Sequence, residues 1–177
     1  FNDLCGEFVG LTNVEKANDS FYELMVRGKL MNAGEFRTSF RLPVASSDGY
    51  FRVEGEMSEM NLSLLNPVIT PLTKIEIESG KVNGMNFHIS GNAQEATTDV
   101  EFLYENLKIT LLREKDGRLK KAFVLSDIIN GVLVRKNNLL GDRVRSGRAT
   151  VERDIYRSQF NYLWRSLFAG IEKIIEV

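Results

Sequence analysis

The chain has 177 residues, of which 43% are hydrophobic and 27% are charged, and its formal net charge is -1. This length is sufficient for one domain with its own core, and 3 prolines are too few for a disordered chain. A net charge near zero gives no general attraction to nucleic acid. No stretch is long and apolar enough to span a bilayer.

The dominant pattern is an alternation of apolar and polar residues, which is typical of strands with one face in water. It runs through residues 21–30, 36–42 and 50–57, so we expect an antiparallel meander. Further alternating runs follow at 85–91 and 100–111. The apolar side of these runs carries Tyr22, Leu24, Val26, Phe36, Phe40, Phe51, Val53, Phe87, Ile89, Phe102, Tyr104, Ile109 and Leu111.

Turn signals divide the second half of the chain. Asn83-Gly84 lies between two alternating runs and predicts a hairpin, because both residues tolerate positive φ. Residues 100–104 and 107–111 are expected to form two further strands, followed by a turn at Asp116-Gly117.

The region after that turn is less regular. Residues 119–131 suit a helix or a buried strand equally. Strands near 132–137 and 147–153 would complete the sheet.

Two segments favour helices. Residues 61–72 contain two prolines, which a central strand would not tolerate, and predict a short helix crossing between sheet halves. From Asp154, the expected N-cap, apolar residues recur at helical spacing as far as Ile175. The chain is therefore expected to be mainly β: a curved antiparallel sheet with a short crossing helix and a C-terminal amphipathic helix.

The expected layout is one domain over residues 1–177, cut from a longer protein. Residues 1–19 form an unassigned lead-in, residues 20–153 the sheet, and residues 154–177 the amphipathic helix.

Few residues have the chemistry of a catalytic or metal site. His88 is the only histidine and Cys5 the only cysteine, so no metal-binding spacing exists. His88 points opposite to Phe87 in its run, toward the wet face, as do Glu54 and Glu56 in theirs. We therefore expect no enzyme activity, no cofactor and no metal.

Basic residues gather near the C-terminal end of the predicted sheet. They are Arg135, Lys136, Arg143, Arg145, Arg148, Arg153 and Arg157. Arg143, Arg145 and Arg148 are candidates for binding phosphate headgroups or an acidic protein. The alternative is a solvated loop whose charges protect strand edges. A nucleic-acid partner is not expected, because no recognised binding motif is present.

The order of these elements resembles a known family. GYFRVEGEMSEMNLSLLNPVITPLTKIEIESGKVNGMNFHISGN (49–92), VEFLYENLKITLL (100–112), DIINGVLVRKNN (127–138) and ERDIYRSQFNYLWRSLFAGI (152–171) together resemble the C-terminal region of bacterial AsmA-like proteins of Bacteroidetes type. Asn137-Asn138 departs from the Asn-Pro that is frequent in the family.

The resemblance implies an envelope protein whose body is a long, bent sheet with an apolar groove. It would be tethered to the inner membrane by a helix outside this fragment and would project into the periplasm. The implied role is outer-membrane biogenesis or phospholipid transport between membranes. The expected partners are phospholipid acyl chains and envelope proteins.

Two alternatives stay open at this point. The apolar sheet face could be an ordinary core, with the C-terminal helix as its lid, or that helix could insert its aromatic residues at a membrane interface. A protein-interaction module that uses an exposed sheet edge or the basic residues of 135–157 is the alternative function.

Overall fold

The structure is a computed structural model that describes residues 1–10, 21–43, 48–115, 118–125, 134–141 and 143–176. Its strands are β1 (Asn2–Val9), β2 (Phe21–Leu30), β3 (Gly34–Pro43), β4 (Phe51–Met57), β5 (Met60–Asn61), β6 (Ile75–Gly91), β7 (Glu95–Lys115), β8 (Arg118–Leu125) and β9 (Ser146–Glu152). Its helical elements are the 3-10 turn η1 (Leu62–Leu65), α1 (Asn66–Thr73) and α2 (Gln159–Ile175).

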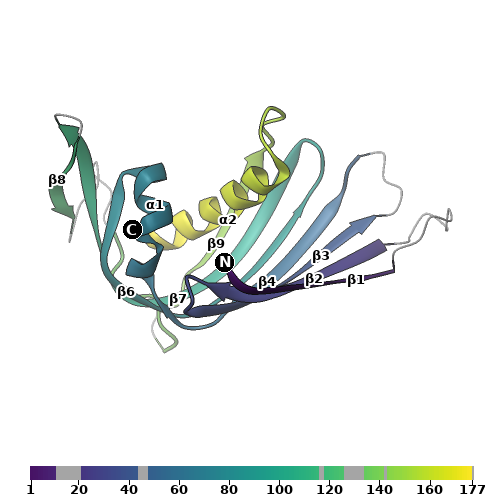
Figure 1. Cartoon of the computed structure of the whole chain (residues 1–177), viewed down its shortest axis with the longest axis horizontal. Coiled ribbons are helices and arrows are strands. Elements are labelled where there is room, and N and C mark those ends of the chain that lie inside the picture. The colour runs from purple at the N-terminus through teal and green to yellow at the C-terminus, as the bar shows by residue number, and fades with distance from the viewer. Residues whose placement is uncertain (11–20, 44–47, 116–117, 126–133, 142, 177) are drawn as a thin grey trace.

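The strands form an open antiparallel sheet in the order β1-β2-β3-β4-β6-β7-β8. β5 pairs with β6, and β9 pairs with the first part of β7. Figure 1 shows the sheet curving around α1 and α2, which lie on the same side of it. The predicted fold class, mainly β with a curved antiparallel sheet and a C-terminal helix, is confirmed.

Cross-strand register aligns the apolar residues of neighbouring strands into rows. Leu24 pairs with Phe8 on one side and with Phe40 on the other, and the row continues through Val53 and Ile89. Residues paired in an antiparallel ladder point to the same face of the sheet. The alternating pattern therefore produces one continuous apolar face, on the side where the helices lie.

The next row belongs to the opposite face. Met25 pairs with Ser39, Ser39 with Glu54, Glu54 with His88, and His88 with Asp99, each on the next strand of the sheet. The predicted wet face is thus confirmed from β2 to β7, and His88 lies on it.

The hairpin predicted at Asn83-Gly84 is wrong. Both residues lie inside β6, which pairs with β7 on either side of them. A register shift occurs there, and another occurs around Gly80, whose φ is +146°. Such bulges bend a strand without ending it. The partner strand continues past the turn signal, and its ladder hydrogen bonds keep β6 in one piece.

The two strands predicted at 100–104 and 107–111 are likewise parts of the single strand β7. Asn106, between them, has a φ of 55° and marks a bulge in β7. Its amide donates to the Asn137 side chain at 2.8 Å, so the irregular backbone keeps a hydrogen bond.

Other expectations fared differently. Residues 2–9, for which no element was expected, form β1, whereas the strand expected at 147–153 is confirmed as β9. β8 is a strand over 118–125.

The turn at Asp116-Gly117 and residues 126–133 lie outside the described residues. The strand expected at 132–137 is wrong for 134–137, where Val134 makes only an isolated bridge to Glu176.

The short helix is confirmed at η1 and α1, which join β5 to its own partner β6. Asn61 caps η1, because its side chain accepts from the Ser63 amide at 3.0 Å. Pro67 lies in the first turn of α1, where its missing N–H removes no helical hydrogen bond. Lys74 ends the helix in the left-handed conformation, with a φ of 57°.

Helix α2 begins later than expected. Its N-cap is Ser158, whose Oγ accepts from the Asn161 amide at 3.2 Å. The predicted N-cap Asp154 is wrong. Its carboxylate accepts from the Tyr156 amide at 3.0 Å and closes a turn ahead of the helix.

Helix α2 packs against β9, β7 and β6 with very close backbone contact. Its buried residues Tyr162, Ser166, Gly170 and Ile174 recur every fourth position. A Cβ atom added to Gly147 of β9 would overlap the carbonyl oxygen of Gly170. One added to Gly170 would lie 2.6 Å from Val100 Cγ2. Only glycines let the helix come this near.

We predict that Gly147→Ala lowers the free energy of unfolding by about 1–3 kcal/mol, because the new methyl group meets backbone that cannot move without lifting α2. Urea unfolding followed by circular dichroism measures this. Gly84→Ala is the matched control, because nothing lies within 4 Å of a Cβ there. Equal stability of the two variants would contradict the account of how α2 is positioned.

Candidate functional site

The structure divides the thirteen predicted lipid-face residues into two groups. Six of them are no more than 9% exposed and belong to the core beneath α2, η1 and α1: Phe51, Val53, Ile89, Phe102, Tyr104 and Ile109. The others stay partly exposed: Tyr22, Leu24, Val26, Phe36, Phe40, Phe87 and Leu111. Phe87 packs against both core clusters, and Leu111 pairs with Ile75 of β6, so neither belongs to the surface that the other five form. The expected apolar wall is therefore partly a packed core and partly a surface on β2 and β3.

That surface is the part of the apolar face that α2 leaves uncovered. We call it the open face, and its residues are Leu4, Phe8, Tyr22, Leu24, Val26, Phe36 and Phe40. Leu4 is 62% exposed and Phe8 is 54% exposed. Among the described residues of β1, β2, β3 and β4, no charged side chain has a register position on this face.

The β1 part of the open face was missed from the sequence. Leu4, Gly6 and Phe8 alternate with Cys5 and Glu7, which is the same signal that revealed the later strands. The run is short and starts beside a bulge at Asp3, whose φ is 51°.

The N-terminal residue extends this face. The ring of Phe1 meets that of Phe36 edge-on, with the centroids 5.5 Å apart. Such aromatic pairs are favourable beyond the area they bury.

Helix α2 borders the open face with apolar side chains. Leu163 and Leu167 pack in the same cluster as Phe40. Phe160 lies one turn before Leu163, and its side chain is 66% exposed. Trp164 lies one turn before Leu167, and its side chain is 40% exposed. The apolar surface therefore continues from the sheet onto the helix.

Tyr104 illustrates why the buried group is not a ligand surface. It is 0% exposed, and its hydroxyl donates to the Arg135 carbonyl at 2.9 Å. Burial raises the pKa of its phenol to about 12, because a phenolate there would lose its water. Tyr104 therefore anchors the segment after residue 133 to the core.

Asn138 is a second anchor that sequence reasoning missed. It is completely buried, and its Nδ2 donates to the carbonyls of Phe102 at 2.8 Å and Arg145 at 2.9 Å. Its Oδ1 accepts from the Arg145 amide at 2.9 Å. No spacing rule marks such an asparagine in advance, because its partners are backbone groups that the fold brings together.

The seven basic residues do not form one patch. Arg135 donates to the carbonyls of Asn137 and Arg143, and Arg145 donates to the carbonyl of Glu176 near the end of α2. These three guanidinium contacts stabilise the chain itself.

The other basic residues point in different directions. Arg148 faces Asp99 at 3.7 Å on the polar face, away from the open face. Arg153 lies over the ring of Tyr162, 5.7 Å from its centroid. Of the three headgroup candidates, Arg143 and Arg145 lie near the C-terminal end of α2, and Arg148 is separated from them by the sheet.

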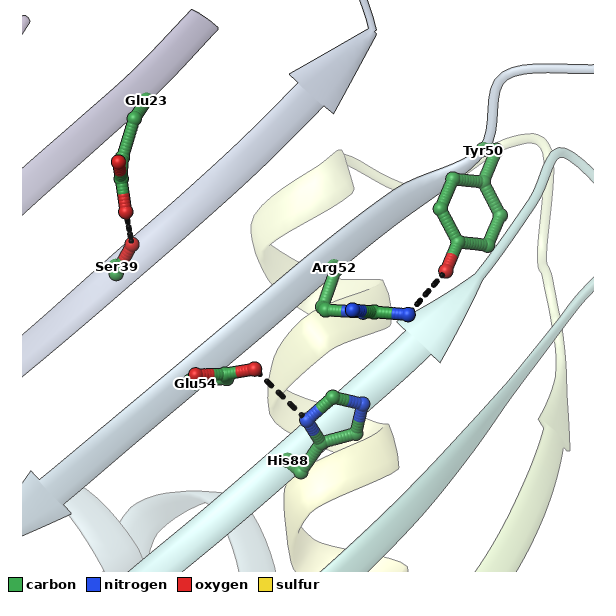
Figure 2. A network of polar contacts seen from close by, with 6 residues as sticks. All are labelled: Glu23, Ser39, Tyr50, Arg52, Glu54 and His88. Carbon is green, nitrogen blue, oxygen red and sulfur yellow. Dashed lines mark hydrogen bonds and ion pairs between the residues drawn. The ribbon is translucent and has the colours of Figure 1, made fainter. Parts of the chain in front are cut away.

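The polar face has a shallow trough of about 890 Å³, on the side of the sheet opposite α2. Figure 2 shows the contacts beside and within it. Ser39 donates to Glu23 at 2.6 Å, and His88 Nδ1 lies 3.3 Å from Glu54. Such cross-strand partners are what a solvated sheet face uses to satisfy its charges.

The trough also carries the lone cysteine. Cys5 lines it and is exposed and free. In the part of the chain that the structure describes, no three histidine, cysteine, aspartate or glutamate residues are placed to hold a metal ion.

Neither described helix has the length and hydropathy needed to cross a membrane. No protein-family model, curated protein or solved structure matches this chain. The resemblance to AsmA-like proteins therefore stays a prediction, and the site is interpreted from its own geometry.

We predict that Tyr104 ionises in the folded protein only as the pH approaches about 12. The stability gained by burying its neutral phenol is present below its ordinary pKa near 10 and is lost as the pH rises toward 12. Phenolate absorbance during alkaline titration measures this, and Tyr104→Phe should remove the ionisation step near pH 12. Tyr156→Phe, at a position 91% exposed, should leave that step in place. The opposite result would contradict the burial of Tyr104.

Proposed function

We propose that the open face binds phospholipid acyl chains. We further propose that the domain is a non-catalytic part of an envelope protein that carries lipid between membranes or supports outer-membrane biogenesis. The observation that carries the proposal is the continuous, uncharged row from Phe8 through Leu24 and Phe40 to α2, which stays partly exposed.

The physical chemistry of this face suits acyl chains. Each methylene moved out of water contributes about 0.8 kcal/mol, so a smooth apolar surface can hold a chain without specific contacts. The backbone polar groups inside the sheet are already paired in ladders, and therefore a bound chain would meet no unsatisfied donor. Exposed, contiguous apolar surfaces of this kind mark binding sites in many proteins.

The two borders of the open face also support the proposal. On one side, Leu163 and Leu167 of α2 pack beside Phe40, and the exposed Phe160 and Trp164 lie next to them on the helix. On the other side, β1 ends the described sheet with Leu4 and Phe8 in water. A chain lying on β2 and β3 would touch apolar side chains from below and from the helix side.

A protein-interaction module is the second candidate, favoured by one observation. Among the described strands, β1 pairs only with β2, so its outer edge can accept a further strand. The basic residues support this alternative less than the sequence suggested, because the fold separates them.

The matched substitutions Leu24→Glu and Met25→Glu test the lipid proposal. These neighbours lie on opposite faces of β2, and Met25 is 42% exposed on the polar face. We expect Leu24→Glu to weaken acyl-chain binding by at least about tenfold, because a carboxylate on the open face must stay hydrated. Met25→Glu should bind as the parent does. Phe102→Glu is unsuitable, because residue 102 is 4% exposed and belongs to the core.

Trp164 provides the readout, because it is the only tryptophan and lies beside the open face. Phospholipid brominated on its acyl chains should quench its fluorescence, and mass spectrometry should detect phospholipid that co-purifies with the parent protein. Absence of both signals would refute the lipid proposal. Concentration-dependent self-association or capture of an added β-strand peptide in that case would support the interaction module.

A further inference from the structure

The turn between β9 and α2 presents apolar side chains where a turn normally carries polar ones. Ile155 and Tyr156 occupy its two central positions, because the Arg157 amide donates to the Asp154 carbonyl at 3.1 Å. Ile155 is 71% exposed and Tyr156 is 91% exposed. Central turn positions usually carry glycine, asparagine, aspartate or proline, so this pair is unusual.

Hydrogen bonds and an ion pair hold the turn, although the side chains at its tip are mostly exposed. The carboxylate of Asp154 accepts from the Tyr156 amide at 3.0 Å and lies 3.8 Å from Arg157 Nε. Below the turn, the Arg153 amide donates to the Gln94 carbonyl at 2.7 Å, and above it Ser158 caps α2. Figure 1 shows this segment standing out from the sheet at the N-terminal end of α2. The apolar tip is thus presented by a hydrogen-bonded turn between β9 and α2.

Phe160, in the first turn of α2, is 66% exposed and extends the tip toward Trp164 and the open face. We call Ile155, Tyr156 and Phe160 together the apolar tip. These three side chains can bury far less area than the roughly 800 Å² per partner that a standard protein interface buries. A bilayer interface, by contrast, accepts a small convex apolar tip, and aromatic residues are enriched there.

The charges around the tip favour an anionic surface. Residues 153–165 contain three arginines, Arg153, Arg157 and Arg165, and a single acidic residue, Asp154. Asp154 and Arg157 form an ion pair within the turn, and Arg157 keeps 69% of its side chain exposed. Glu95 and Glu152 pair with each other in register on the polar face of the sheet. Burial raises the pKa of the Tyr162 phenol of α2, and Glu95 lies near enough to help raise it. Along the chain, the apolar tip is therefore flanked by arginines, one of which is paired with Asp154.

We propose that the apolar tip inserts into the interface of a bilayer that contains anionic phospholipid. Insertion would dock the domain beside the membrane that supplies or accepts its lipid. The tip is continuous with the apolar side of α2 and, through it, with the open face. This proposal goes beyond acyl-chain binding. Phe160 borders both surfaces, whereas Ile155 and Tyr156 belong to the tip alone, so substitution of these two residues tests docking separately. Each can therefore fail without the other.

The test is sedimentation of the full chain with vesicles of phosphatidylcholine, with and without phosphatidylglycerol. The parent protein should bind the mixed vesicles more tightly, and added salt should weaken this binding, because exposed charges are screened. The double variant Ile155→Ser/Tyr156→Ser should lose at least about tenfold in vesicle affinity. Because both side chains are mostly in water, this variant should fold as the parent does.

Leu140→Ser is the matched control, since Leu140 is 74% exposed. Leu140 precedes β9, whereas the tip follows the other end of that strand. The vesicle binding of this control should equal that of the parent. Quenching of Trp164 by a dispersed brominated lysophospholipid, without vesicles, should be the same in the double variant and the parent. The docking proposal is overturned if the double variant binds mixed vesicles as the parent does, or if the parent binds no vesicles.

Discussion

The backbone contact between Gly147 of β9 and Gly170 of α2 fixes how much of the sheet is covered. Because neither position has a Cβ, the helix lies directly on β9 and β7, with Val100 filling the space beside it. A helix seated this near one side of the sheet cannot also reach β1 and β2. The glycine pair thus decides which apolar residues become core and which remain at the surface.

The long, bent strands β6 and β7 determine the curvature around that helix. Both strands are irregular at matching places, near Gly80 in one and Asn106 in the other. Bulges increase twist and bend, so the sheet curls toward the side that carries α1 and α2. The fixed anchors Tyr104 and Asn138 then tie the segment after residue 133 to the bent region.

The two faces of the sheet have opposite chemistry for the same local reason. Alternating side chains place every charge of β2, β3 and β4 on the polar face, where cross-strand partners such as Glu54 and His88 satisfy one another. This leaves the open face uncharged without any special device. Acyl-chain binding and bilayer docking, as proposed above, would use this uncharged face and the exposed tip at the start of α2.

The sequence by itself determined the period of the strands from β2 to β4, the identity of the apolar face and the presence of a C-terminal amphipathic helix, because these depend on residue spacing along the chain. It could not determine that Asn83-Gly84 stays inside a strand, since that depends on β7 running alongside. It assigned the helix cap to Asp154 instead of Ser158, because both residues can cap and only the path from β9 distinguishes them. Tertiary structure alone decided that Phe51 is buried whereas Leu24 is not, because burial depends on where a distant helix comes to rest.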